Sequence, residues 1–265
     1  MLTDDQLTHF HDKGWVRLSP AFAPEAALEI QNFMWDQLGQ LHGIDRSAPE
    51  TWRQSWSGLN KKTRHPVYQQ VGNPTLWGAV DQLLGPDNWN PPSGWGGFLV
   101  SPPDADESPW DVTDHFWHWD GNPAAPSEQI NSLFTLTLYS AIAPGGGGTL
   151  LLEGSHRLIK PFFAVHNDGS VKRKALRRLF CQSHPWLAEL SGYAPDQGDR
   201  MRRFMEEGTI IDGVPVRVVE ATGEPGDAIL CYSCIFHTRS HNRAQVPRFM
   251  RVCGIGKKGK KEEEE

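Results

Sequence analysis

The sequence predicts a mainly β protein, a sandwich or barrel with helices packed outside it, and three patterns support this prediction. Apolar residues recur at helical spacing through the first third of the 265 residues. From about residue 97 onward, short runs rich in β-branched and aromatic residues alternate with Pro and Gly. The longest apolar runs have the length of strands, so we expect no membrane-spanning helix. Strands that follow a helical segment in this way are typical of a β core with helices on its outside.

The N-terminal third is predicted to hold three helices and one short strand. Thr3 and Gln6 have the spacing of a capping box, which predicts a helix that ends at Gly14. Residues 24–38 carry apolar side chains at the spacing of a helix with one buried face. The remaining elements expected here are a strand over residues 15–18 and a helix over residues 75–84.

The rest of the chain is predicted to supply the β core. The expected strands cover residues 97–101, 114–120, 131–142, 149–152, 214–220, 227–237 and 248–256. Residues 160–208 interrupt them with the basic segments KRKALRRLF and RMRRF, which predict a helical insertion. The arginines of this insertion either hold an acidic group of a substrate or form a solvated helix face. Residues 257–265 contain no apolar side chain and are expected to be disordered, so one domain is predicted over residues 1–256.

Composition limits the classes of function. A net charge of −6 does not favour binding to nucleic acid, because such binding needs a basic face. The acidic N-terminus has no apolar signal core, so we expect a cytoplasmic protein. Four cysteines do not make a disulfide framework, and Cys231 and Cys234 form a C-x2-C motif without the second pair of a zinc site. We therefore expect these two residues to be buried thiols.

A candidate metal site lies in the segment HFWHWDGNP. His118 and Asp120 are two residues apart, so on a strand both side chains project from the same side. His237 ends a long apolar run. On a regular strand, the residues that share its face would be Cys231, Ser233 and Ile235. Two histidines and one carboxylate form the facial triad of non-heme iron(II) oxygenases, which leaves three coordination positions open. An H-x-D pair also occurs by chance, and a lone histidine near a strand end is more often structural, so the residues alone leave both interpretations open.

Other histidines fit a triad less well, and the aromatic residues beside it suggest a pocket. His115 would face the opposite side of the strand from His118, His156 lies in a Gly-Ser-His turn, and His241 follows His237 by four residues. Three tryptophans flank the proposed ligands and are candidates to line a pocket for a flat or apolar substrate, with core packing as the alternative: Trp110, Trp117 and Trp119.

Four segments together resemble the phytanoyl-CoA dioxygenase family of iron(II)- and 2-oxoglutarate-dependent oxygenases. They are the opening LTDDQLTHFHDKGWVRLSPAF, the triplet HWD at 118–120, GGGGTLLLEGSHR at 145–157 and HTRSHNRAQVPR at 237–248. Their order and spacing are similar to those of the family over nearly the whole chain. The resemblance implies a double-stranded β-helix, which is a cupin-like jelly-roll barrel of two sheets.

The resemblance also implies roles for individual residues. His118, Asp120 and His237 would hold Fe(II), and Arg248, eleven residues after His237, would bind the far carboxylate of 2-oxoglutarate. A guanidinium suits this role because it meets a carboxylate with two parallel charge-assisted hydrogen bonds. The hydroxyl of Thr149 is a further candidate contact for 2-oxoglutarate, the alternative being an ordinary strand residue.

Three other arginines bear on this assignment. Arg243 and Arg251 are rivals to Arg248, although Arg251 is three residues further along the same expected strand and would face outward. Arg239 stands where members of the family commonly carry a small hydroxyl residue. It either adds a second cation to the co-substrate pocket or turns to solvent.

The reaction implied by the resemblance uses dioxygen to decarboxylate 2-oxoglutarate to succinate and CO2, and to oxidise a C–H bond of a small organic substrate, most often by hydroxylation. Related halogenases lack the carboxylate that Asp120 supplies, so halogenation is not expected. One alternative is a non-catalytic jelly-roll protein that binds a ligand and retains the metal site. Another is a zinc or other metal hydrolase on a similar barrel, in which Arg248 has no evident role. The sequence does not identify the primary substrate.

Overall fold

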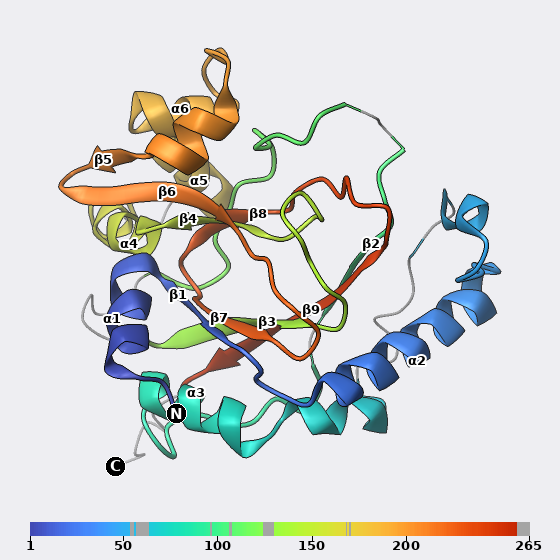
Figure 1. Ribbon diagram of the computed structural model, residues 1–265. Helices are drawn as coiled ribbons and strands as arrows, with labels where there is room; N and C mark the ends of the chain where they lie inside the picture. The colour runs from blue at the N-terminus through green and yellow to red at the C-terminus, as the bar shows by residue number, and fades with distance from the viewer. Residues whose placement is uncertain are drawn as a thin grey trace.

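Two antiparallel sheets form the centre of the computed structural model, which describes residues 1–53, 56, 64–95, 97–105, 108–123, 130–167, 169 and 171–258. One sheet has five strands in the order β1-β7-β3-β9-β2, and the other has four in the order β5-β6-β4-β8. Figure 1 shows the two sheets facing each other with the helices around them. The predicted fold class, a mainly β jelly roll with flanking helices, is confirmed.

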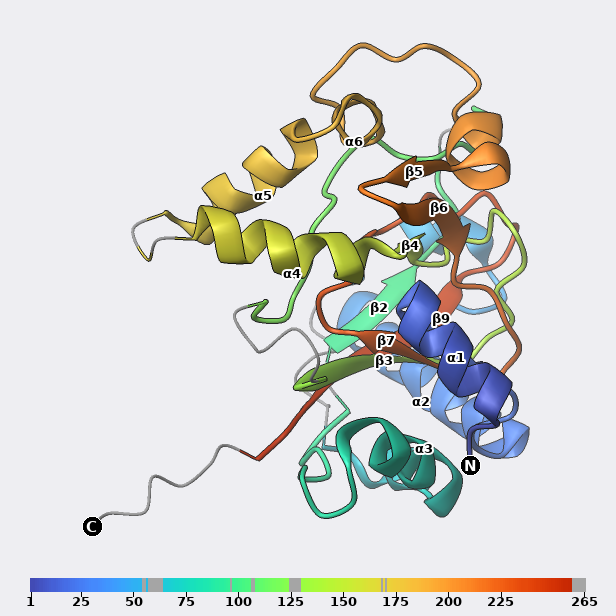
Figure 2. The same cartoon turned by 90° about the vertical axis from the view of Figure 1, so that its left-hand side faces the viewer.

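The N-terminal helices flank the five-stranded sheet. Its strands are β1 Trp15–Leu18, β7 Ala228–Tyr232, β3 Ser132–Leu138, β9 Arg248–Gly256 and β2 Gly97–Ser101. The helices are α1 Asp4–Lys13, α2 Pro24–His42 and α3 Pro74–Leu84, with the 3-10 helices η1 Pro49–Arg53 and η3 Pro66–Val71 between the last two. Both views show α2 and α3 on the side of this sheet that faces away from the other sheet (Figures 1 and 2).

The start of the chain follows its sequence signals closely. Gln6 N donates to Thr3 Oγ1 at 3.2 Å and Thr3 N donates to Gln6 Oε1 at 2.9 Å, so the predicted capping box is confirmed. Gly14 ends α1 in the left-handed conformation, at φ 87°, which glycine adopts without steric strain. The other two predicted helices are also confirmed, although α2 runs on to His42.

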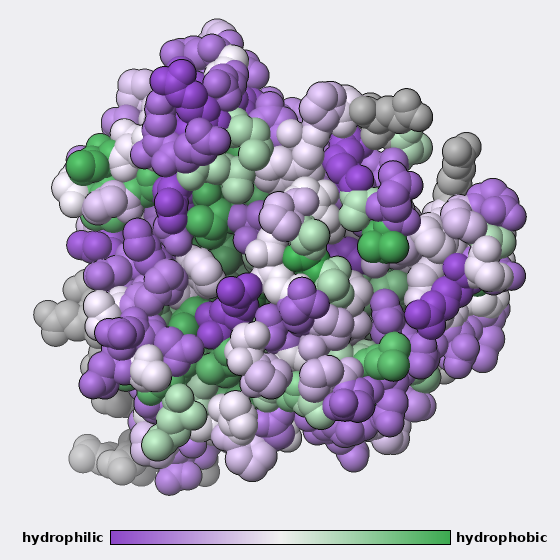
Figure 3. All heavy atoms as spheres, in the orientation of Figure 1, coloured by the Kyte–Doolittle hydropathy of each residue, from purple (hydrophilic) through white to green (hydrophobic). Residues whose placement is uncertain are grey.

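The four-stranded sheet is joined to a group of helices. Its strands are β5 Thr209–Ile211, β6 Val214–Glu220, β4 Leu150–Glu153 and β8 Phe236–Thr238, of which β5 was not predicted. Between β4 and β5 the chain forms α4 Ser155–His166, α5 Arg173–Gln182, α6 Pro185–Leu190 and the π-helix η4 Met201–Glu207. The surface around α6 is strongly hydrophilic in the view of Figure 3, where this part lies at the top.

The smaller of two apolar clusters joins the two sheets. Its buried members are Phe134, Leu136, Leu138, Ile142, Leu151, Ala221, Ile229, Cys231, Ile235 and Met250. Alternate residues of a strand share a face, so Arg248 of β9 lies on the same side as Met250, between the sheets. Phe249 and Arg251 lie on the opposite side, where Phe249 packs against Trp35 of α2 with ring centroids 5.0 Å apart.

Two predicted strands are wrong in ways that matter for the site. Residues 114–120 form no strand; only His118 pairs, in an isolated bridge with His237. Residues 227–237 do not form one strand, because a turn at Ser233 and Cys234 separates β7 from β8, which belong to different sheets. The expectation of one shared strand face from Cys231 to His237 therefore fails. The remaining predicted strands are present, with residues 131–142 shortened to Ser132–Leu138.

The first two residues of the charged C-terminal tail are bound to the rest of the fold. Lys257 N donates to Asn131 O at 2.8 Å and Lys258 N to Asn88 O at 2.6 Å, so these two residues of the expected disordered tail are held in place. Residues 259–265 lie outside the described residues.

All four cysteines are buried and unbridged, so the expected buried thiols at Cys231 and Cys234 are confirmed. None of the helices in the described ranges combines the length and apolar character needed to cross a membrane.

Candidate metal centre

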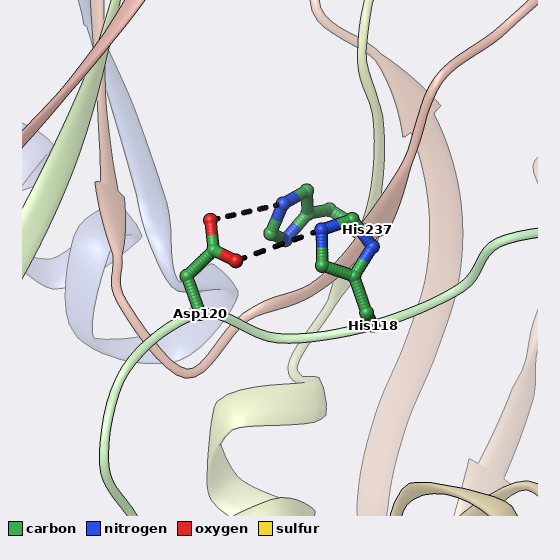
Figure 4. Close-up of side chains that lie close together, drawn as sticks. All are labelled: His118, Asp120 and His237. Carbon is green, nitrogen blue, oxygen red and sulfur yellow. Dashed lines mark ion pairs between the residues drawn. The ribbon is translucent and has the colours of Figure 1, made fainter. Parts of the chain in front are cut away.

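The structure brings His118, Asp120 and His237 together, as the sequence predicted. The two histidines exchange backbone hydrogen bonds of 2.9 and 2.8 Å, and their ring centroids are 4.3 Å apart. The Asp120 oxygens lie 3.6 Å from Nε2 of His118 and 3.6 Å from Nε2 of His237, and the carboxylate faces both rings (Figure 4). One ligand atom from each residue lies within 4.8 Å of the others, and no other such cluster of His, Cys, Asp or Glu occurs in the part of the chain that the structure describes.

The two imidazoles are oriented as metal ligands usually are. Nδ1 of His118 lies 2.7 Å from the Phe116 carbonyl oxygen, and Nδ1 of His237 lies 3.0 Å from the Ile235 carbonyl oxygen. A carbonyl only accepts, so each Nδ1 carries the proton and donates it. Each Nε2 then presents a lone pair toward Asp120, which is the arrangement that fixes a histidine for metal binding. Ligand atoms around an ion with bonds of about 2.1 Å lie about 3 Å apart, so the three side chains fit a metal after small movements.

Burial keeps His237 in the form that binds metal. Its side chain is 9 % exposed, and burial, followed by the charge of the neighbouring His118, lowers its pKa to about 4. The imidazole is therefore neutral at neutral pH. Asp120 is 52 % exposed on the other side of the cluster, so the centre is open to solvent on the side of the carboxylate.

The turn between β7 and β8 holds the segment that carries Asp120. The amides of Asp120 and Gly121 both donate to the Ser233 carbonyl oxygen, at 3.2 and 2.7 Å. A Cβ atom on Gly121 would lie 2.2 Å from Ser233 Oγ, so only glycine allows this approach. The turn that the sequence did not predict is thus the element that positions the carboxylate.

Arg248 is a buried cation between the sheets. Its guanidinium donates to Ser101 Oγ at 2.9 Å and to the Gly147 carbonyl oxygen, while its buried Nε has no hydrogen-bond partner within the described ranges. Burial lowers its pKa to about 10, and the charges of Glu220 and Asp104 act in the opposite direction. An unpartnered donor on a buried guanidinium fits a carboxylate ligand such as the far end of 2-oxoglutarate.

The rival residues have other surroundings. Arg251 is fully buried on the outer face of its sheet, over the rings of Tyr68 and Phe98 at 4.2 and 4.4 Å, and so lies opposite Arg248 as strand alternation predicted. Arg243 lies 3.6 Å from Asp104 beside a cavity of about 570 Å³ at the surface.

Two further candidates can be placed. Thr149 directly precedes β4, is buried, and is two residues from Leu151, which belongs to the cluster between the sheets. The structure therefore puts it on the inner side, as a contact with a co-substrate would require. Arg239 is exposed and lies over the ring of Phe116 at 4.7 Å, which agrees with the solvent-facing alternative rather than with a second cation beside Arg248.

The tryptophans next to the triad are mostly core residues. Trp117 and Trp119 are buried and pack on Phe236, with ring centroids 5.4 and 6.2 Å away. For these two the pocket interpretation is wrong. Trp110 lines the 570 Å³ surface cavity and donates from Nε1 to the His241 carbonyl oxygen at 3.1 Å.

Two arginines that the sequence did not single out touch the metal-site segment. Arg173 and Arg177 of α5 both donate to the Trp119 carbonyl oxygen, at 3.3 and 2.5 Å. The basic composition of residues 160–208 marked this region, and the spacing of four residues puts both side chains on one helix face. Which segment that face meets depends on the tertiary fold.

Comparison with known proteins identifies the fold. No family model and no curated protein matches the sequence. Among solved structures, EctD from S. alaskensis in its apoform matches 96% of this chain and 77% of its own, at 16% identity and a TM-score of 0.54. The non-heme α-ketoglutarate-dependent carbocyclase SnoK from nogalamycin biosynthesis matches 96% and 84%, at 13% identity and a TM-score of 0.53. The nickel complex of the non-heme monooxygenase ThoJ matches 94% and 76%, at 13% identity and a TM-score of 0.52. The structural match shows that the chain has the fold of these non-heme oxygenases, a jelly roll. At identities this low the likeness shows the fold alone.

Proposed function

We propose that the chain is an iron(II)- and 2-oxoglutarate-dependent dioxygenase that oxidises a C–H bond of a small organic substrate. Hydroxylation is the reaction that we propose first. The observation that carries this proposal is the convergence of His118, Asp120 and His237, with both Nδ1 atoms bound to carbonyl groups and both Nε2 atoms turned to the carboxylate. The fold that the chain shares with non-heme oxygenases supports it.

Each residue of the site has a defined role in this proposal. His118, Asp120 and His237 hold iron(II) through three donors and leave three positions for co-substrates. Iron with 2-oxoglutarate and dioxygen supplies the oxidising power, with release of succinate and CO2. Arg248 binds the far carboxylate of 2-oxoglutarate through its guanidinium, and the Thr149 hydroxyl contacts the same co-substrate.

Asp120 also favours oxygenation over halogenation. Together with the two histidines, the Asp120 carboxylate would supply three protein ligands to the metal and would take the place in which chloride could otherwise bind. No position then remains for chloride. We therefore propose that the products are alcohols, epoxides, alkenes or new rings, and that none of them carries a halogen.

The test is the release of succinate from 2-oxoglutarate in the presence of iron(II), air and a panel of small metabolites. We expect slow release without a substrate and faster release with a compound that fits, and no release from His237→Ala. His241→Ala is the matched control, because His241 is an exposed histidine bound to Asp104 and stands outside the triad. Iron-loaded protein that releases no succinate with any compound would instead identify a ligand-binding jelly roll.

A further inference from the structure

Helix α5 places two arginines on the segment that carries the metal ligands. Arg173 donates to the carbonyl oxygens of Trp119, Asp120 and Gly121, and Arg177 donates to that of Trp119 at 2.5 Å. The guanidinium carbon of Arg177 also lies 5.6 Å from the centroid of the Trp119 ring. Figure 2 shows α5 beside α4 at the side of the barrel. One face of α5 therefore borders the open side of the metal centre.

Among the residues that the structure describes, no carboxylate forms an ion pair with either arginine. Carbonyl oxygens accept hydrogen bonds but are neutral, so the two guanidinium groups remain cationic side by side. Burial and then the charge of Arg173 lower the pKa of Arg177, and the carboxylate that acts in the opposite direction is Asp120. In the proposed enzyme, however, Asp120 is a metal ligand. Its negative charge is then offset by the metal and no longer compensates the arginines.

Arg177 also has one N–H group, on Nε, that the described residues leave without an acceptor. This Nε is buried, although the side chain as a whole is only partly buried. A buried N–H without a partner is rare in folded proteins and points to a missing acceptor. Two neighbouring guanidinium groups that form no ion pair within the described part of the chain suit an oxyanion, which they can meet with charge-assisted hydrogen bonds.

We propose that Arg173 and Arg177 bind an anionic group of the primary substrate, a carboxylate or a phosphate, and so hold the substrate beside the three residues that would bind the metal. This inference rests on the proposed function, because it assigns the substrate class of the same site. The substrate is then an organic acid or a phosphate ester. The competing explanation is structural, in which the two arginines only dock α5 onto the backbone of residues 119–121.

Calorimetric titration with two anionic probes tests the proposal. Benzoate and phenylphosphonate are titrated into protein loaded with nickel(II) and a small excess of 2-oxoglutarate, which occupies the metal so that the probes do not bind there. We expect at least one probe to bind the unmodified protein, and the tighter one identifies the oxyanion. Benzamide, a neutral analogue of benzoate, should not bind. Arg177→Gln and Arg173→Gln should each weaken binding about tenfold or more, since each removes a charge-assisted contact.

Lys174→Gln is the matched control, because it removes one positive charge from an exposed position of the same helix. Its affinity for the probe should stay within about twofold of the unmodified protein. Arg177→Lys keeps the charge without the paired donors, so its affinity for the probe should fall between those of Arg177→Gln and Lys174→Gln. This variant provides the measurement if Arg177→Gln folds poorly. The proposal is overturned if neither probe binds, or if Arg177→Gln and Lys174→Gln bind it equally. It is also overturned if the arginine variants lose nickel together with the probe, since that result assigns them to docking of the helix.

Failure of the proposed function gives a different result. If the unmodified protein does not take up nickel, the triad assignment fails. The probe titration in metal-free protein still tests the arginines, with weaker binding expected there because Asp120 keeps its charge. Loss of that binding in Arg177→Gln would support the anion site independently of the metal.

Discussion

Arg248 and Arg251 show how a shift of three residues on one strand changes what a charged side chain can do. Both are buried, and burial lowers the pKa of each guanidinium, yet one lies between the sheets and the other under the helices. Arg251 lies over the rings of Tyr68 and Phe98, where cation–π attraction offsets part of its loss of hydration. Arg248 is the one that a ligand between the sheets can reach, because it lies on the inner face of β9 together with Met250.

Replacing Arg248 with Ala should mainly raise the concentration of 2-oxoglutarate that the protein requires. Removing one partner from a buried charge pair typically costs about 2–5 kcal/mol, or roughly 30- to several-thousand-fold in affinity. Titration of metal-loaded protein with 2-oxoglutarate measures this change directly. Arg251→Ala is the comparison, and we expect it to lower the melting temperature while leaving the affinity of the folded protein for 2-oxoglutarate unchanged. The reverse pattern would mean that Arg251 serves the co-substrate.

His156 links stability to pH at a position away from the metal ligands. It is buried, stacks on Tyr232 with ring centroids 5.1 Å apart, and its Nε2 lies 3.0 Å from the His11 carbonyl oxygen. Burial lowers its pKa from 6.5 to about 4. The unfolded chain therefore takes up a proton on this group below about pH 6.5, whereas the folded chain does so only near pH 4. The free energy of unfolding should fall over that window as the pH is lowered, by up to about 3 kcal/mol.

The variant His156→Gln tests this dependence, because glutamine keeps an N–H for the His11 carbonyl and does not titrate. We expect it to be less stable than the unmodified protein at pH 7.5, with the difference narrowing toward pH 4. Urea unfolding of metal-free protein at several pH values provides the comparison. If the two stability curves stay parallel between pH 6.5 and 4, His156 is not the group that titrates there.

At the scale of elements, the site depends on irregular backbone that alternation in the sequence does not predict. Residues 114–120 have the aromatic and polar alternation of a strand, but Phe116 adopts a left-handed conformation at φ 61°, which no regular strand contains. Within the described residues, the only β pairing of this segment is the isolated bridge between His118 and His237. Likewise, Ser233 and Cys234 turn the chain from one sheet to the other, although the apolar run from residue 228 to 237 gives no local sign of a break.

Gly121 tests whether the turn between β7 and β8 positions Asp120. Replacing it with Ala would drive a Cβ into Ser233 and push the Asp120 carboxylate away from the histidines. Overpacking of this kind typically costs about 1–3 kcal/mol, which corresponds to roughly five- to 150-fold weaker metal binding if the displacement is borne by the site. Nickel titration measures the effect. Gly254→Ala is the matched control, since a Cβ on Gly254 of β9 would meet nothing within 4 Å, and equal affinities of the two variants would contradict a positioning role.

At the scale of the whole molecule, local signals in the sequence predicted more than long-range ones. The capping box at Thr3, the glycine that ends α1 and the apolar period of α2 depend on neighbours within a few residues, and these predictions are confirmed. The approach of His118 to His237 joins residues far apart in the chain; the residues alone left it open, and the resemblance to a family favoured it. The basic composition of residues 160–208 marked the insertion, but nothing in the sequence indicated that α5 contacts the Trp119 backbone.

The proposed active site combines both sheets. His237 belongs to β8 of the four-stranded sheet, Arg248 belongs to β9 of the five-stranded sheet, and Asp120 lies on a connecting segment. Bound iron and 2-oxoglutarate would therefore connect the two sheets, which are otherwise joined mainly by the apolar cluster between them. A ligand that binds only the folded state also stabilises it, so loading should raise the melting temperature with ligand concentration.

Anaerobic titration of the iron(II)-loaded protein with 2-oxoglutarate, followed by visible absorption, tests the central claim most directly. A chelated 2-oxo acid on iron(II) gives a charge-transfer band, so no primary substrate is needed. We predict a band that saturates at one 2-oxoglutarate per bound iron, that is absent in His237→Ala, and that needs a higher concentration of 2-oxoglutarate in Arg248→Ala. Iron that binds without producing the band, or a band of full strength in His237→Ala, would contradict the assignment of His118, Asp120 and His237 as the centre at which this protein binds iron and its co-substrate.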